Sequence, residues 1–252
     1  MRLGVVVPCH NDAPYLGRCL AAIHAAGPST AVVVVDRCSD ASRDVALSAG
    51  RDLVLEKPTT SWRNSTAENL ELGFRLLLDR DYVAVVGADT LVPANFWHET
   101  VSLLEADPGL ASVSGVMHAA DPLYHSYELF LESLGLAHHL RSSGRVYRMS
   151  AIRAFLFADH QAVEDGIAED LRLDAKLLPA GGSAALPSVR MVDVRRWSLG
   201  KSLRGQFNSG RARRILGRPL RQCFGELPRL RPFVVVGWLV GGEGDDEEGR
   251  AP

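Results

Sequence analysis

The first 117 residues alternate between short apolar runs and segments with helical periodicity, and this alternation limits the possible folds more than any other feature. The apolar runs are rich in valine and have the length of buried strands. Strands are expected at 3–8, 31–36, 52–56, 82–87 and 110–116, and helices at 14–26, 41–49, 66–79 and 93–106. Because strands alternate with helices, the sequence predicts an α/β fold, with a mostly parallel central sheet and helices on both faces.

The remainder of the chain follows a less regular pattern. Residues 118–217 are expected to form a second α/β half of the same domain as residues 1–117. Its expected helices lie at 121–141, near 151–157, at 168–182 and at 200–217, and its expected strands lie at 144–150 and 188–194. Residues 218–240 are basic and apolar, and residues 241–252 form an acidic tail of low complexity that is expected to be disordered.

Several polar residues follow the predicted strands directly. Ligands bind outside the carboxyl ends of the strands in open α/β sheets, so residues 9–12, 36–40 and Asp89 are expected on one rim. Asp89 follows Gly87 and Ala88, two small residues that let the backbone approach a ligand closely. A single acid in such a loop indicates a site for Mg²⁺ or Mn²⁺ beside a diphosphate, since these ions prefer oxygen donors.

These acids also have simpler interpretations. Asp12 and Asp40 each precede a predicted helix, so either can be an N-cap. Asp36 closes its strand before the loop, where capping explains it less well and a nucleobase or ribose contact is the alternative. Asp170 lies in AEDLRLD, which can be a solvated acidic helix face or the site of a general base.

Charge is distributed unevenly along the chain. Between Arg190 and Arg231 there are twelve Lys and Arg residues against Asp193 and Glu226. Such a block favours an anionic partner, either phosphate or lipid headgroups. It lacks the interleaved aromatic residues of single-strand nucleic-acid binders, so no nucleic acid is expected. The apolar run 232–242 is too short to span a bilayer, and we expect a cytoplasmic protein with peripheral contact at the inner face of the membrane.

The sequence excludes several classes of enzyme. It contains neither the GxGxxG fingerprint of dinucleotide-binding dehydrogenases nor the GxxxxGK[ST] phosphate loop. Its eight histidines form no HExxH motif and no evident relay. The four cysteines show no zinc-site spacing, so we expect free thiols in a reducing compartment.

Five segments in order resemble family 2 glycosyltransferases of the GT-A (Rossmann-like) fold, over about residues 3–216. They are VVVPCHNDAPYLGRCLAAI, VVVVDRCSDASRDVA, the stretch that begins VAVVGADTLVPANFW, AEDLRLDAKLLPAG and SLRGQFNSGRARRIL. The resemblance implies that residues 1–117 bind a nucleotide sugar and that residues 118–217 hold the acceptor and the catalytic base. It also implies a divalent ion, Mg²⁺ or Mn²⁺.

The resemblance assigns roles only at matching positions. Asp89 is the expected metal ligand, and Asp170, preceded by Glu169, is the expected catalytic base. The expected nucleotide-binding residues are Pro8, Asn11, Asp12, Asp36, Ala88, Gln206 and Arg211. The predicted function is therefore inverting, hexosyltransferase-like transfer from a nucleotide-diphosphate sugar to an acceptor hydroxyl, with an acceptor that is lipid-linked or membrane-associated.

Some positions depart from the family pattern. The DxD motif reads Gly87–Ala88–Asp89 and lacks its first acid, and Arg37 replaces the usual second acid after Asp36. The segment QFNSG lacks the Arg and Trp of processive synthases, which argues against a polymer synthase. The alternatives are a non-catalytic nucleotide-sugar-binding protein, degenerate at Gly87, and a nucleotidyltransferase on a similar fold.

Overall fold

The structure is a computed structural model of the 252-residue chain. It describes residues 2–27, 29–50, 52–60, 65–134, 143–156, 181–196, 198–215, 217, 219–229 and 231–240. The expected helix 168–182 and the acidic tail 241–252 therefore lie outside the described residues, except for residues 181–182.

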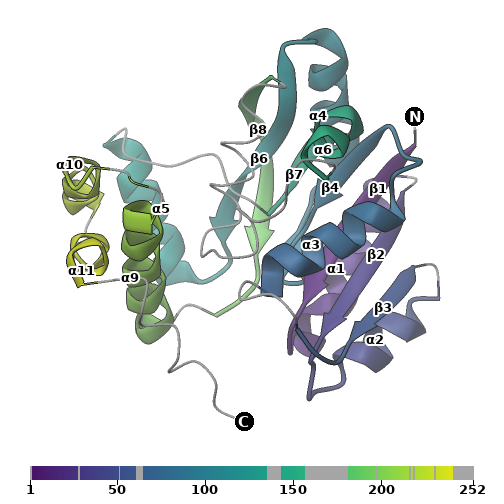
Figure 1. Ribbon diagram of the computed structural model, residues 1–252, viewed down its shortest axis with the longest axis horizontal. Helices are drawn as coiled ribbons and strands as arrows, with labels where there is room; N and C mark the ends of the chain where they lie inside the picture. The colour runs from purple at the N-terminus through teal and green to yellow at the C-terminus, as the bar shows by residue number, and fades with distance from the viewer. Residues whose placement is uncertain are drawn as a thin grey trace.

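The first half contains the expected alternation of strands and helices (Figure 1). Its elements are β1 (Leu3–Cys9), α1 (Ala13–Ala25), β2 (Thr30–Asp36), α2 (Ser42–Ser48), β3 (Leu53–Lys57), α3 (Ser65–Leu76), β4 (Tyr82–Val85), β5 (Thr90–Leu91), α4 (Phe96–Ala106) and β6 (Leu110–Ala119). All nine predicted elements are present, and β5 is an additional two-residue strand.

The second half contributes two further strands and a set of helices. Its elements are α5 (Pro122–Ser133), β7 (Arg145–Arg148), α6 (Met149–Leu156), β8 (Gly182–Asp193), α9 (Leu199–Ile215), α10 (Arg221–Phe224), the short 3₁₀ helix η2 (Leu227–Arg229) and α11 (Phe233–Val240). The strand expected at 188–194 begins earlier, at Gly182. The sequence also did not predict that the apolar run after Pro232 is a helix.

The eight strands form one sheet in the order β3-β2-β1-β4-β7-β6-β8-β5. The strands β3, β2, β1 and β4 are parallel to one another, as the βαβ pattern predicts. β7 is antiparallel to both β4 and β6, while β6 and β8 are parallel. The sheet is therefore parallel in the first half and mixed in the second half.

Helices cover both faces of the sheet because the central strands are apolar on both sides. In β1, Val5 and Val7 belong to a core cluster that includes residues of α1 and α4, while Val6 belongs to a second cluster that includes residues of α3 and α6. All three valines are fully buried. The continuous valine runs of β1 and β2 follow from burial on both faces.

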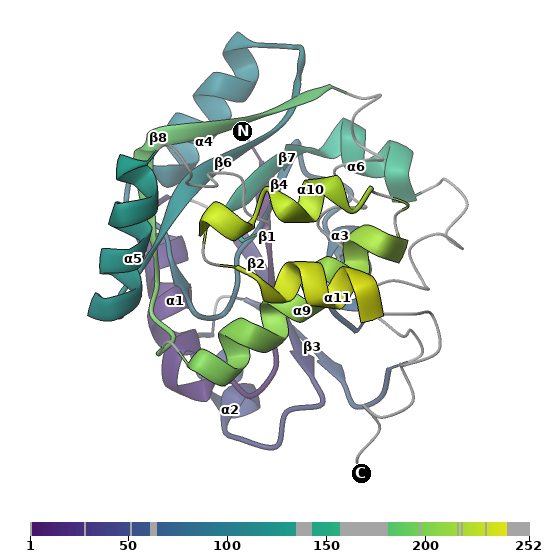
Figure 2. The ribbon, with the colours of Figure 1, turned by 90° about the vertical axis from the view of Figure 1, so that its left-hand side faces the viewer.

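A separate layer of the helices α9, α10 and α11 lies to one side of the sheet, and α5 packs on β6 (Figures 1 and 2). α9 packs closely on α11 through two glycines. A Cβ atom at Gly210 would lie 2.0 Å from Val234 O, and one at Gly237 would lie 2.0 Å from Phe207 O. Among the described helices, none has the length and apolar character needed to cross a bilayer.

Candidate functional site

The candidate site lies at the carboxyl edge of β1, β2 and β4. These strands are parallel neighbours and end at Cys9, Asp36 and Val85, so the residues that follow them meet at one edge. Pro8 pairs with Val34 just inside this edge. The structure therefore brings Asp12, Asp36 and Asp89 to the rim that the sequence predicts.

Asp12 and Asp89 are joined by an arginine from the far end of the chain. Arg195 lies 2.8 Å from each carboxylate, with its NH2 nitrogen toward Asp12 Oδ1 and its Nε toward Asp89 Oδ2. Asp12 does occupy the N-cap position of α1, but its side chain makes no capping hydrogen bond. Its carboxylate instead accepts a hydrogen bond from Arg195, which favours a role in the site over capping.

Local pairing explains how Arg195 reaches this place. β5 follows Asp89 directly and runs antiparallel to the end of β8, with Thr90 opposite Asp193. The Val194 N–H donates to Asp89 O over 2.9 Å, and the Arg195 N–H donates to Asp193 Oδ1 over 2.9 Å. The two-residue strand β5 thus places the end of β8 beside the Asp89 loop.

Electrostatics at Asp89 favour a cation. Burial raises the pKa of Asp89 above its usual range, the positive charge of Arg195 opposes this shift, and the charges of Asp193 and Asp12 add to it. Neighbouring carboxylates repel one another unless positive charge is present. Arg195 supplies that charge in the structure, and a divalent ion bound by the same oxygen atoms would do the same.

The loop before Asp89 is closely packed. Cys19 Sγ donates to Gly87 O, and the Gly87 N–H donates to Ser143 Oγ over 2.9 Å. Ala88 is buried in the apolar core, so only its backbone can meet a ligand. A Cβ atom at Gly87 would lie 2.8 Å from Asp89 Oδ1, so an acid at position 87 would require the Asp89 side chain to shift.

Asp36 is held in a network at the end of β2. Its Oδ1 atom lies 2.9 Å from Arg37 Nε and 3.4 Å from Lys57 Nζ, and its Oδ2 atom accepts from Ser65 and Asn69. Burial alone would raise the pKa of Asp36, but these hydrogen bonds and the charge of Lys57 lower it to about 2. Asp36 is therefore an anion. For its carboxylate to accept a hydrogen bond from a nucleobase, one of its present hydrogen-bond donors would have to move away.

Two residues with left-handed backbone lie beside this network. Asn11 has φ of 55° and Arg37 has φ of 46°. The Asn11 side chain accepts from the Ser39 N–H over 2.8 Å and from the Asp40 N–H over 3.3 Å, which joins the loops after β1 and β2. Residues other than glycine in this conformation are uncommon and are often found at functional sites.

The other predicted site residues lie elsewhere or outside the described chain. Gln206 and Arg211 are buried on α9, in the layer of helices beside the sheet (Figure 1). Gln206 Oε1 has no hydrogen-bond partner among the described residues, so this buried oxygen atom could accept a hydrogen bond from a ligand. Glu169 and Asp170 lie outside the described residues.

Sequence reasoning missed Arg195 and Lys57 as members of the site. Arg195 belongs to VDVRRW, a segment without a recognisable motif. Lys57 could have been found from the pattern of parallel strands, because Lys57 ends β3 and pairs with Asp36 at the end of β2. No local pattern in the sequence links Arg195 to Asp12 or Asp89, from which it is separated by more than 100 residues.

Comparison with solved structures supports the fold. The mannosyltransferase PcManGT from Pyrobaculum calidifontis, solved with GDP-Man and Mn²⁺, is 18% identical with a TM-score of 0.64, and the match covers 94% of this chain and 69% of that one. Residues 1–349 of S. aureus TarS, solved with UDP-GlcNAc, are 13% identical with a TM-score of 0.62, over 93% of this chain and 72% of that one. The chain spans 43% of a longer S. aureus TarS structure.

Comparison with families gives the classification. No curated protein matches the chain. The family described as glycosyl transferase family 2 matches residues 4–152, which is more than half of the sequence and includes Asp12, Asp36 and Asp89. With its GT-A architecture and the carboxylates at the carboxyl edge of its sheet, the chain belongs to glycosyl transferase family 2.

Proposed function

We propose that this protein is an inverting, hexosyltransferase-like enzyme that moves a sugar from a nucleotide-diphosphate sugar to an acceptor hydroxyl. One observation carries the proposal: Asp12 and Asp89 converge on a single cationic centre at the carboxyl edge of a family 2 fold. Cleavage of the anomeric C–O bond leaves a diphosphate of growing negative charge, and positive charge held at this edge stabilises it.

The residues at the edge fit a divalent cation. Asp12 and Asp89 offer the hard oxygen donors that Mg²⁺ and Mn²⁺ prefer, and Arg195 shows that the place accepts positive charge. Asp89, with help from Asp12, would hold the ion. When bound, the ion would neutralise charge on the leaving diphosphate. The mannosyltransferase neighbour that was solved with GDP-Man and Mn²⁺ supports this assignment.

The remaining predicted residues would orient the donor. Pro8, Asn11 and Asp36 would line the nucleoside end, where Asn11 already fixes the two rim loops. The backbone at Ala88 would approach the diphosphate. Gln206 and Arg211 would reach the donor or its phosphates only if α9 comes nearer to the rim. Their burial in the helical layer makes them the least supported members of the set.

Asp170, preceded by Glu169, is proposed as the catalytic base. The carboxylate would remove the proton of the acceptor hydroxyl as the hydroxyl attacks the anomeric carbon from the face opposite the diphosphate. Alignment of both substrates supplies much of the remaining rate enhancement. Attack from the opposite face is what makes the transfer inverting.

We propose that the acceptor is lipid-linked and that the protein contacts a membrane peripherally, at the cytoplasmic face. Of the thirteen large hydrophobic residues that are exposed in the described part of the chain, nine lie on α5 or between Phe224 and Val240, and Leu134 follows α5 directly. These segments occupy the same side of the molecule (Figures 1 and 2). A face of this kind can lie in a bilayer interface without crossing it.

The proposal is tested by separating donor binding from transfer. Donor binding and donor hydrolysis are measured with UDP- and GDP-linked sugars, with and without Mn²⁺. Asp89→Asn should abolish metal-dependent donor binding, and Asp170→Asn should retain binding but lose transfer, since an amide cannot accept the proton. Asp44→Asn is the matched control, because Asp44 is an exposed acid on α2.

Two outcomes would reject parts of this proposal. Unchanged nucleotide affinity of Asp89→Asn in Mn²⁺ would remove Asp89 from the metal site. Donor binding without any hydrolysis or transfer by the parent protein would favour a non-catalytic nucleotide-sugar-binding protein, the alternative to which the glycine at position 87 points.

A further inference from the structure

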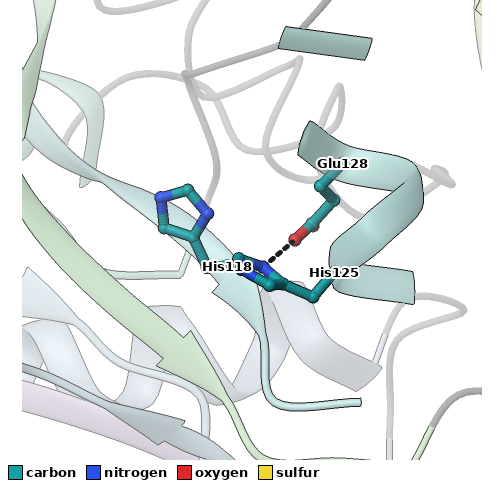
Figure 3. Close-up of side chains that lie close together, drawn as sticks. All are labelled: His118, His125 and Glu128. Carbon is teal, nitrogen blue, oxygen red and sulfur yellow. Dashed lines mark ion pairs between the residues drawn. The ribbon is translucent and has the colours of Figure 1, made fainter. Parts of the chain in front are cut away.

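A second group of ligand-type side chains lies apart from Asp89, between the end of β6 and the first turns of α5 (Figure 3). It consists of His118, His125 and Glu128, whose donor atoms all lie within 4.8 Å of one another. It is the one such group of three or more His, Cys, Asp or Glu residues in the described part of the chain. From this geometry we propose a second metal site, of the class that binds Zn²⁺.

Local structure brings the three side chains together. His118 is the penultimate residue of β6, and a short turn leads into α5, where the Asp121 side chain caps the helix and Pro122 occupies its start. His125 and Glu128 are three residues apart and therefore share a face of α5. Because α5 packs on β6, that face meets His118 (Figure 3).

The two histidines have unsatisfied nitrogen atoms. Nδ1 of His118 and Nδ1 of His125 are both buried and have no hydrogen-bond partner among the described residues. His118 as a whole is only 8% exposed. His125 Nδ1 lies 3.9 Å from Glu128 Oε2, which is too far for a hydrogen bond. A buried polar atom without a partner is unfavourable, and coordination of an ion would satisfy it.

Glu128 is already oriented for such a role. Its Oε2 atom accepts the Ala119 N–H over 2.8 Å, which fixes the carboxylate beside the histidines. The two imidazole rings lie edge to face with centroids 5.6 Å apart. Tetrahedral zinc with bonds of about 2.0–2.1 Å needs its ligands roughly 3.4 Å apart. The three donor atoms must therefore move closer together to bind zinc. The His125 side chain is 41% exposed and has room to rotate toward the other two ligands.

The donor set selects the type of ion. Two imidazoles and one carboxylate suit zinc and related transition ions, whereas Mg²⁺ prefers oxygen donors and keeps several waters. Three protein ligands leave a fourth position for water or substrate. The site differs from the Asp89 centre, but the two are linked through the sheet, because Ala119 is paired with Asp193 and the Ala120 N–H donates to Asp193 O.

The test is zinc binding by the full-length protein after removal of metal with a chelator. We expect one Zn²⁺ per chain, and Co²⁺ in its place should give the visible absorption of a tetrahedral site. His118→Ala, His125→Ala and Glu128→Gln should each weaken zinc binding at least about 100-fold, since loss of a supporting contact alone costs about 10–100-fold. His98→Ala is the matched control, because His98 is exposed on α4.

Two further variants keep the test decisive. Glu128→Gln retains an oxygen that can accept the Ala119 N–H, so it removes the anionic ligand while preserving the local fold. Asp89→Asn should leave zinc affinity unchanged, which separates this site from the donor centre. The proposal is overturned if the parent protein binds zinc no more tightly than His125→Ala and Glu128→Gln. Either result leaves the proposed glycosyl transfer intact.

Discussion

Nε of Arg195 lies 2.8 Å from Oδ2 of Asp89, so a guanidinium occupies the place where we propose that a divalent ion binds. The same arginine contacts Asp12 at 2.8 Å. Burial raises the pKa of Asp89, and the positive charge of Arg195 opposes this shift. A metal ion at the proposed site would therefore compete with Arg195 for the same oxygen atoms.

Replacement of Arg195 by alanine should strengthen Mn²⁺ binding. A partly exposed ion pair is worth up to about 1 kcal/mol, so removal of the competing guanidinium should lower the Kd for Mn²⁺ roughly fivefold. Titration of the protein with Mn²⁺, followed by electron paramagnetic resonance, measures this value directly. Arg196→Ala, at an exposed neighbouring position, is the control. Unchanged or weaker Mn²⁺ binding would mean that Arg195 itself provides the cation.

Restoring the first acid of the DxD pattern should damage the site. A Cβ atom at position 87 would lie 2.8 Å from Asp89 Oδ1 and 3.2 Å from Ser143 Oγ, and a second carboxylate there would repel Asp89. Gly87→Asp should therefore weaken nucleotide binding in Mn²⁺ and lower the Tm by at least about 2–4 °C. Gly87→Ala isolates the effect of the Cβ atom. Tighter nucleotide binding by Gly87→Asp would contradict this packing argument.

The Asp36 network should make the protein more stable above pH 4 than at lower pH. A carboxyl group whose folded pKa is lowered, here to about 2, contributes stability above its unfolded pKa of about 3.9 and loses it as pH falls through the folded value. We expect Asp36→Asn to lower the free energy of unfolding by about 1–2 kcal/mol at pH 7, after allowance for screening.

Urea unfolding at pH 7 and near pH 2.5 checks this expectation. The difference between the parent protein and Asp36→Asn should shrink at the lower pH, where Asp36 begins to take up a proton. Asp44→Asn, which removes a carboxylate that is 79% exposed, should show little difference at either pH. A constant difference across this range would mean that Asp36 contributes through shape rather than charge.

The first half of the fold was predictable because its signals are local and agree with one another. The valine runs of β1 and β2 are buried on both faces, and such strands cannot be mistaken for surface elements. The acids that follow these strands had to meet at one edge, because parallel strands end together. Asp12, Asp36 and Asp89 were therefore found from the sequence alone.

The rest depended on contacts that sequence spacing does not encode. Arg195 reaches Asp89 only because the short strand β5 pairs with the end of β8, and a two-residue strand leaves no periodic signal. His118 and His125 belong to different elements, so no single helical pattern contains both. The whole run from Phe233 to Val240 is apolar, which hid the fact that its helix has one buried face and one exposed face.

That exposed face leads to the last prediction, which concerns membranes. α11 buries Val234 and Gly237 against α9, while Leu239 and Val240 remain 54% and 63% exposed. Several nearby arginines have other roles, since Arg213 and Arg231 pair with the buried Glu226 and Arg214 donates to the carbonyl groups of Trp238 and Leu239. Apolar insertion should therefore contribute more to membrane binding than the basic block suggests.

Flotation with vesicles that contain anionic lipids tests this expectation. The parent protein should float at low salt and remain partly bound at high salt, because salt screens the arginines but not the apolar contact. Leu239→Asp combined with Val240→Asp should abolish flotation, since each charge would enter the interface. Leu47→Asp combined with Leu53→Asp, at exposed leucines of α2 and β3, is the matched control and should float like the parent. A parent protein that stays in the unbound fraction with anionic vesicles at low salt would reject membrane association, and with it the structural reason to expect a lipid-linked acceptor.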